Sequence, residues 1–119
     1  MKKIPCSIDI LEESGEACWL VAVSMDNAVQ VALQLSALHT ELVSKIVFQD
    51  AFHNKTITLH KHSAVYKEHL VPVTECWLEA VLRLFLKTVL SGWTDTAHLD
   101  QTFLSITGNV TITLEITDP

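Results

Sequence analysis

Thr74–Gly92, with the sequence TECWLEAVLRLFLKTVLSG, dominates the hydrophobic content of this small chain. Thr74 suits the start of a helix, because its hydroxyl can accept a hydrogen bond from an amide of the first turn. Gly92 suits the left-handed position that ends many helices. The charged side chains inside the segment recur every four residues and form one narrow stripe: Glu75, Glu79, Arg83 and Lys87. A surface helix has a wider polar face, so we predict a helix over 75–91 that is buried on most sides, by its own domain or by a second subunit.

A membrane span is the alternative interpretation of this segment. A span needs about 20 mostly apolar residues, and charges near its centre are strongly unfavourable. Glu79, Arg83 and Lys87 interrupt the apolar sequence at regular spacing. We therefore expect no membrane-spanning segment.

The composition bounds the class of protein. A chain of 119 residues is expected to form one domain, residues 1–119. Its 14 acidic and 8 basic residues disfavour nucleic-acid binding, which needs clustered Lys and Arg, and suit a basic protein partner instead. Only 18% of the residues are charged, below the roughly 25% of ordinary domains. Apolar surface is therefore expected to remain uncovered until the protein self-associates or joins a stable complex.

The cysteine pattern and the start of the chain indicate a compartment. Three cysteines without a CxxC pair argue against a disulfide scaffold or a zinc ribbon, and for a reducing cytosol. Lys2 and Lys3 resemble the start of a signal peptide, but Asp9, Glu12 and Glu13 interrupt any apolar segment after them. We therefore expect a cytoplasmic protein.

Alternation of apolar and polar residues predicts strands at 4–11, 17–24, 46–52 and 55–62. Residues 28–35 also alternate, but a helical pattern extends further on both sides, so we predict a helix near 26–44. Residues 63–74 are expected to form a loop, and 93–100 a polar connection.

A final hairpin gives the clearest strand signal. Val110 and the apolar residues after it alternate with Thr and Glu, and Leu104 and Ile106 alternate before it. A three-residue loop over 107–109 would pair Ile106 with Val110 and Leu104 with Ile112, which places apolar residues opposite one another. We therefore predict that loop and register.

The resulting element order is ββα-ββα-ββ, an α+β fold. The simplest architecture is one mainly antiparallel sheet with both helices, about 26–44 and 75–91, packed on one face. The other face of this sheet would be rich in Thr, Ser and His.

A metal site is the first candidate for chemistry. His60 and His62 lie two apart on a predicted strand, so their Cα atoms would be about 7 Å apart on the same face. Asp50 or His53 could add a ligand, since zinc takes three or four nitrogen, sulfur or oxygen ligands. The alternative interpretation is a solvated polar face.

Cys76 is a second candidate, because the first turn of a helix can lower the pKa of a thiol. A histidine such as His69 could act as its base. Glu75 and Glu79 would oppose a thiolate, however, so we interpret Cys76 as a small buried packing residue.

An acidic turn is the third candidate. Asp9, Glu12, Glu13 and Glu16 surround the first predicted hairpin tip. They are interpreted either as an ordinary solvated turn or as a contact patch for a basic partner.

The sequence contains no GxGxxG, P-loop, GxSxG or HExxH motif. The leading hypothesis is a non-catalytic cytosolic protein that acts through protein–protein contact. One concrete form is an inhibitor of the bacterial immunity-protein kind that neutralises a basic partner, by analogy in size and acidity alone. The alternatives are a metal-binding module or metal-dependent enzyme using His60 and His62, and a structural subunit of a homo-oligomer.

Overall fold

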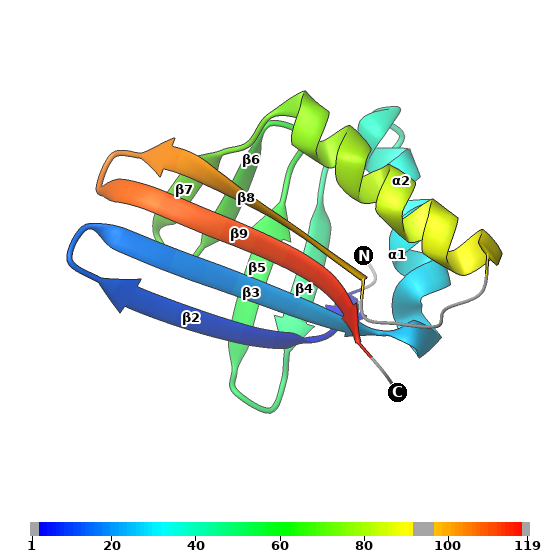
Figure 1. Ribbon diagram of the computed structural model, residues 1–119, viewed down its shortest axis with the longest axis horizontal. Coiled ribbons are helices and arrows are strands. Elements are labelled where there is room, and N and C mark those ends of the chain that lie inside the picture. Colours follow the sequence, from blue (N-terminus) through cyan, green and yellow to red (C-terminus); the bar gives the residue numbers. More distant parts are fainter. Residues whose placement is uncertain (1–2, 92–96, 118–119) are drawn as a thin grey trace.

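The computed structural model describes residues 3–91 and 97–117. Nine strands and two helices occur in these residues (Figure 1): β1 (Lys3–Pro5), β2 (Ser7–Glu13), β3 (Glu16–Ser24), α1 (Met25–His39), β4 (Ile46–Asp50), β5 (Lys55–Leu59), β6 (Ser63–Tyr66), β7 (His69–Pro72), α2 (Glu75–Ser91), β8 (Ala97–Ser105) and β9 (Gly108–Thr117). The predicted α+β class is confirmed. Of the two helices, neither combines the length and the apolar content that a membrane crossing requires.

The strands form two sheets, so the predicted single sheet is wrong. One sheet has the order β1-β4-β5-β6-β7 and the other the order β2-β3-β9-β8. Most neighbours are antiparallel, but β1 pairs with β4, and β3 with β9, in parallel. Both parallel pairs join strands far apart in sequence, which local alternation cannot reveal.

The chain passes from one sheet to the other at Cys6. We predicted one strand over 4–11, but β1 and β2 belong to different sheets. Ile4 and Ile8 are both fully buried, one on each side of this crossing. The Cys6 amide donates a hydrogen bond to the Gln49 carbonyl at 3.1 Å, which fixes the crossing against β4. The predicted alternation is correct, but it does not show that the pairing partner changes.

The core lies between the two sheets and beneath the helices. Trp19 of β3 packs edge-to-face against Tyr66 of β6, with ring centroids 5.9 Å apart, so the sheets meet face to face. Trp77 of α2 packs in the same way against Phe103 of β8 at 5.7 Å. Figure 1 shows both helices at one end of the molecule and the β2–β3 and β8–β9 tips at the other.

Helix α1 ends at His39, five residues before the predicted boundary at 44. Glu41 adopts a positive φ of 64°, and the amides of Leu42 and Val43 both donate to the Ala37 carbonyl. This is the geometry of a helix C-terminus closed by a left-handed residue. The apolar pattern that predicted a longer helix continues to Leu42, but Leu42 lies beyond the helix and its side chain is 81% exposed.

Helix α2 begins as predicted. The Trp77 amide donates to the Thr74 hydroxyl at 3.1 Å, so Thr74 is the N-cap. The exposed face is wider than the charged stripe, since Leu90 is 82% exposed. The expected end at Gly92 lies outside the described residues.

The predicted loop at 63–74 is instead the β6–β7 hairpin, so that prediction is wrong. Its tip contains Lys67 with a φ of 52°. Strand β8 begins at Ala97, within the segment predicted as a polar connection, of which residues 93–96 lie outside the described part.

The predicted register of the last hairpin is also wrong, by three residues. Ser105 pairs with Gly108 and Phe103 with Val110, which leaves Ile106 and Thr107 in a two-residue turn. Phe103 is therefore buried, whereas Leu104 is 77% exposed and Ile106 is fully exposed. A shift by any odd number of residues moves every side chain of a strand to the opposite face.

Candidate functional site

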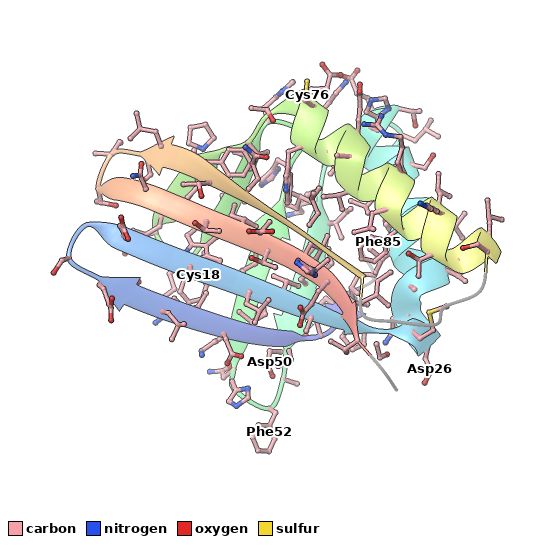
Figure 2. The ribbon with its side chains drawn as sticks, in the orientation of Figure 1. Cys18, Asp26, Asp50, Phe52, Cys76 and Phe85 are labelled. Carbon is pink, nitrogen blue, oxygen red and sulfur yellow. The ribbon has the colours of Figure 1, made fainter. Side chains whose placement is uncertain are left out.

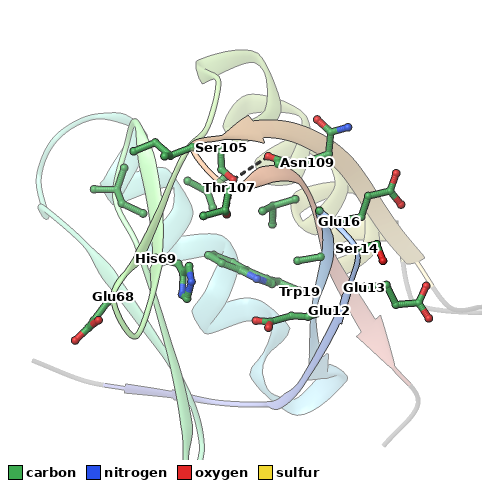
Figure 3. Close-up of a pocket in the computed structure, with 17 residues that line it drawn as sticks. Glu12, Glu13, Ser14, Glu16, Trp19, Glu68, His69, Ser105, Thr107 and Asn109 are labelled. Atoms are coloured by element: carbon green, nitrogen blue, oxygen red, sulfur yellow. Dashed lines mark hydrogen bonds between the residues drawn. The ribbon is translucent and has the colours of Figure 1, made fainter.

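Three hairpin tips meet around a pocket at the end of the molecule away from the helices. The tips belong to β2–β3, β6–β7 and β8–β9, and the pocket volume is about 470 Å³. Figure 3 shows it as a space between the two sheets, with Trp19 extending across it. Because the tips come from both sheets, only the tertiary structure creates this pocket.

Two glycines hold two of the tips together. Gly108 has a φ of 138°, and a Cβ added there would collide with the Gly15 carbonyl oxygen. The Asn109 amide donates to that same oxygen at 3.1 Å, and the Ser105 hydroxyl donates to the Gly108 carbonyl at 2.8 Å. The β2–β3 and β8–β9 tips are thereby joined into one wall of the pocket.

The base of the pocket is aromatic and its rim is acidic. Trp19 is 2% exposed, and Figure 3 shows Glu12 and His69 directed toward it. Glu13, Glu16 and Glu68 point outward at the rim (Figure 3). Among residues 3–91 and 97–117, four glutamates and no Lys or Arg line the pocket, so its electrostatic potential favours a cation.

Strand pairing explains which glutamates face inward. Glu12 pairs with Ala17, on the face of β2 and β3 that carries the core. Glu13 pairs with Glu16, on the opposite face. Two like charges directly opposite one another destabilise a bare hairpin, and a cationic ligand would relieve that repulsion.

The predicted acidic patch is largely brought together by the fold. Glu12, Glu13 and Glu16 line the pocket, whereas Asp9 is exposed on the outer face of β2 and lies outside it. Sequence reasoning missed Glu68 and considered His69 only as a base for Cys76, because their segment was predicted as a loop. The signal that could have found them is a pair of short apolar runs, 64–66 and 70–73, separated by three polar residues that suit a hairpin tip.

Asp50, one of the proposed metal ligands, is buried and already engaged. Its carboxylate accepts hydrogen bonds from the Ile8 amide at 2.9 Å and the His53 amide at 3.0 Å, and it lies 2.6 Å from His53 Nδ1. The Ile8 amide bond, helped by His53 and opposed by burial, lowers the pKa of Asp50 from 3.8 to about 2. Asp50 thus ties the β4–β5 turn to β2 across the two sheets.

The four proposed metal ligands do not converge. Asp50 and His53 lie at one end of β5, opposite Lys55, while His60 and His62 follow Leu59 at the other end. The length of β5 separates the two pairs by roughly 17 Å. A site that uses all four is therefore wrong, and binding by His60 and His62 alone stays a prediction that zinc analysis of the purified protein can test.

A different trio carries metal-ligand atoms in the described residues. The donor atoms of His39, Glu75 and Glu79 lie within 4.8 Å of one another where α1 ends and α2 begins. His39 Nε2 is 3.2 Å from a Glu79 oxygen, and Lys61 Nζ is 3.7 Å from a Glu75 oxygen. Because the His39 ring and the Lys61 ammonium already contact these carboxylates, the cluster is explained as a polar network that joins the two helices to residue 61.

Cys6 is not an activated thiol. Burial, reinforced by the Asp50 carboxylate, raises the pKa of Cys6 to about 12, so Cys6 stays protonated at neutral pH. Cys76 is exposed in the first turn of α2 (Figure 2), so its interpretation as a buried packing residue is wrong. All three cysteines are free.

The pocket is thus the feature of the described residues best arranged to bind a ligand. Its exposed carboxylates can attract a cation, and the apolar part of its lining, of which Trp19 is one member, can pack against an alkyl stem. No family model, curated protein or solved structure matches this chain.

Proposed function

We propose that this chain is a small, acidic, non-catalytic binding protein that receives a basic segment of a partner protein at the pocket between its hairpin tips. The observation that supports this most is the pocket itself. It gathers three glutamates of the β2–β3 hairpin with Glu68 from the other sheet, and in the described part of the chain no Lys or Arg lines it. One concrete form is an inhibitor of the immunity-protein kind, which neutralises a basic partner.

Lysine and arginine suit the pocket chemically. Their alkyl stems can pack against an aromatic base while the charged head stays among the rim carboxylates. Because the rim is exposed, the glutamates contribute mainly to the association rate and to the choice of partner. A net charge of −6 extends the same attraction over the whole molecule.

A cytosolic location is part of this proposal. The three cysteines are free in the structure, and free thiols are typical of reducing compartments. A cytosolic inhibitor would meet its basic partner before that partner reaches its own target.

The test uses a basic probe, the blocked heptapeptide Val-Lys-Lys-Val-Lys-Lys-Val, titrated by calorimetry at low salt. The double variant Glu12→Gln/Glu68→Gln should weaken probe binding by roughly tenfold, as expected for losing two exposed charge interactions. The matched control is Glu115→Gln/Asp100→Gln, which removes the same charge from β9 and β8 outside the pocket lining.

The two double variants separate a site from a general charge effect. The control should change affinity by less than about twofold, because distant surface charges are screened. An equal loss in both variants would mean that net charge alone attracts the probe. Absence of binding by the unmodified protein at low salt would contradict the proposal itself.

A structural homo-oligomer is the second candidate function. Each helix exposes large apolar side chains to solvent: Val29, Leu33, Leu86 and Leu90. Such side chains favour self-association when they gather in a patch. Sedimentation velocity at micromolar concentration tests this, and a monomer there would remove this candidate.

A further inference from the structure

Strand β2 forms an edge of its sheet, next to β3 alone. In an antiparallel pair, alternate residues direct their amide and carbonyl groups away from the partner strand. The Ile8 amide donates to the Asp50 carboxylate, so Ile8 is one of these outward residues. By the two-residue period, the main chains of Ile10 and Glu12 point off the same edge.

The edge is covered at one end and open at the other. At Ile8, Asp50 accepts the amide hydrogen and Lys55 Nζ lies 3.5 Å from the carbonyl oxygen. These two side chains occupy the positions that a neighbouring strand would take. Toward the pocket, among residues 3–91 and 97–117, no hydrogen bond to Ile10 or Glu12 is found on the outward side.

The other edge strands are protected from strand addition, either by their own residues or by a neighbouring strand. Strand β1 contains Lys3 and Pro5, and β7 contains Pro72, which are the usual means of blocking an edge. Strand β8 runs beside β7. Strand β2, SIDILEE, has neither Lys nor Pro.

The open edge is acidic on both faces. Asp9 and Glu13 lie on the outer face of β2, and Glu12 lies on the inner face at the pocket. A strand with basic side chains on both faces would be complementary to this edge. A second copy of this chain, with a net charge of −6, would be repelled.

We propose that the basic segment of the partner adds to β2 as a further strand. Its main chain pairs with Ile10 and Glu12, one set of side chains enters the pocket toward Trp19, and the alternate set meets Asp9 and Glu13. Main-chain bonds then supply affinity and the acidic side chains supply selection, as in other cases of strand addition. This inference rests on the proposed function and assigns its binding mode.

The first test compares two probes of equal charge. One is the heptapeptide Val-Lys-Lys-Val-Lys-Lys-Val, and the other is the same peptide with N-methyl groups on two consecutive central residues. The methyl groups remove a donor from each edge of the peptide and hinder pairing. The methylated probe should bind roughly tenfold more weakly. With the plain probe, amide hydrogen exchange should slow at Ile10 and Glu12.

The second test compares two variants at one position. Glu12→Gln removes the charge and keeps the amide, whereas Glu12→Pro also removes the outward amide. Since that amide faces away from β3, proline is tolerated there in an edge strand. E12P should bind the plain probe roughly tenfold more weakly than E12Q, with a thermal unfolding midpoint close to that of E12Q.

The outcomes distinguish the binding mode from the proposed function. Equal binding of both probes would overturn strand addition, but it would still support binding of a basic segment at the acidic pocket. Slowed exchange along β8 in place of β2 would overturn the location. If neither probe binds at low salt, the proposed function fails, and this inference fails with it.

Discussion

Asp50 shows most clearly how one residue connects distant parts of this molecule. Among the described residues it is the one buried acidic or basic side chain. The sequence marks it as a candidate metal ligand, but its oxygens accept from Ile8 of β2 and from the His53 turn. Its role is therefore to join the two sheets.

Replacing Asp50 with asparagine should lower the thermal unfolding midpoint at pH 7 by roughly 5–10 °C, because an amide NH₂ would face the Ile8 and His53 donors. Asp100→Asn, an exposed change on β8, is the control.

The pKa of Asp50 is about 2 in the folded protein against an ordinary 3.8. The ionised Asp50 carboxylate therefore stabilises the folded protein fully above its ordinary pKa of 3.8. This stabilisation is lost as the pH falls through the folded-state pKa of about 2.

The pH dependence can be measured by urea unfolding between pH 6 and pH 2. The difference between wild type and Asp50→Asn should narrow below about pH 4 and be small near pH 2, since protonation removes the same charge. A difference that stays constant over this range would contradict the assignment of Asp50 as the buried charged acceptor.

Gly108 is the residue on which the pocket wall depends. Gly108→Ala should lower the free energy of unfolding by about 3 kcal/mol or more, because the new Cβ meets the Gly15 carbonyl at a strained φ. Gly15→Ala is the matched variant: its φ is 81°, but no atom lies within 4 Å of an added Cβ. Chemical denaturation should show a loss of only about 1 kcal/mol for Gly15→Ala, and equal losses would contradict the close contact.

The β8–β9 hairpin shows how a local pattern can mislead at the scale of an element. Leu104 and Ile106 alternate convincingly, yet Phe103 and Leu99 face the core side of β8. The tip of this hairpin is held by the parallel pairing of β9 with β3 and by the Gly15–Gly108 contact. Both features join segments that are about 90 residues apart in the chain, so alternation within the hairpin could not reveal them.

The two registers predict opposite mutational results. Phe103→Ala should lower the free energy of unfolding by about 3–5 kcal/mol, as for other buried phenylalanines. Leu104→Ala should change it by less than about 0.5 kcal/mol, since Leu104 is exposed. Urea denaturation of the two variants decides between the registers, and a larger loss for Leu104→Ala would restore the register predicted from the sequence.

The two helix starts offer a second comparison. Thr74→Ala should cost about 1 kcal/mol, because it removes the hydroxyl that accepts the Trp77 amide. Ser24 precedes α1 but makes no side-chain cap, and its hydroxyl only accepts a bond from Asn27 at 3.2 Å. Ser24→Ala should therefore cost less in the same denaturation experiment, and a reversed order would show that the Thr74 cap is not the stronger one.

At the scale of the whole molecule, the two sheets are expected to unfold together. Trp19 packs against Tyr66 across the sheets, and Asp50 bonds to Ile8 across them. A small domain with one shared core unfolds in a single transition. Tryptophan fluorescence and far-ultraviolet circular dichroism should therefore give coincident urea curves, whereas two separate transitions would contradict the single-domain prediction.

The sequence by itself determined what depends on neighbours along the chain. It placed α2 and its Thr74 cap, the central strand β3, the β4–β5 hairpin and the acidic residues of the first turn, because capping, periodicity and charge are local properties. Only the tertiary structure decided the division into two sheets and the β8–β9 register. It also separated the four proposed metal ligands and formed the pocket that brings Glu12 together with Glu68 and His69. Those depend on pairings between distant strands, whose free energy comes from packing in the shared core and leaves no mark in a local pattern.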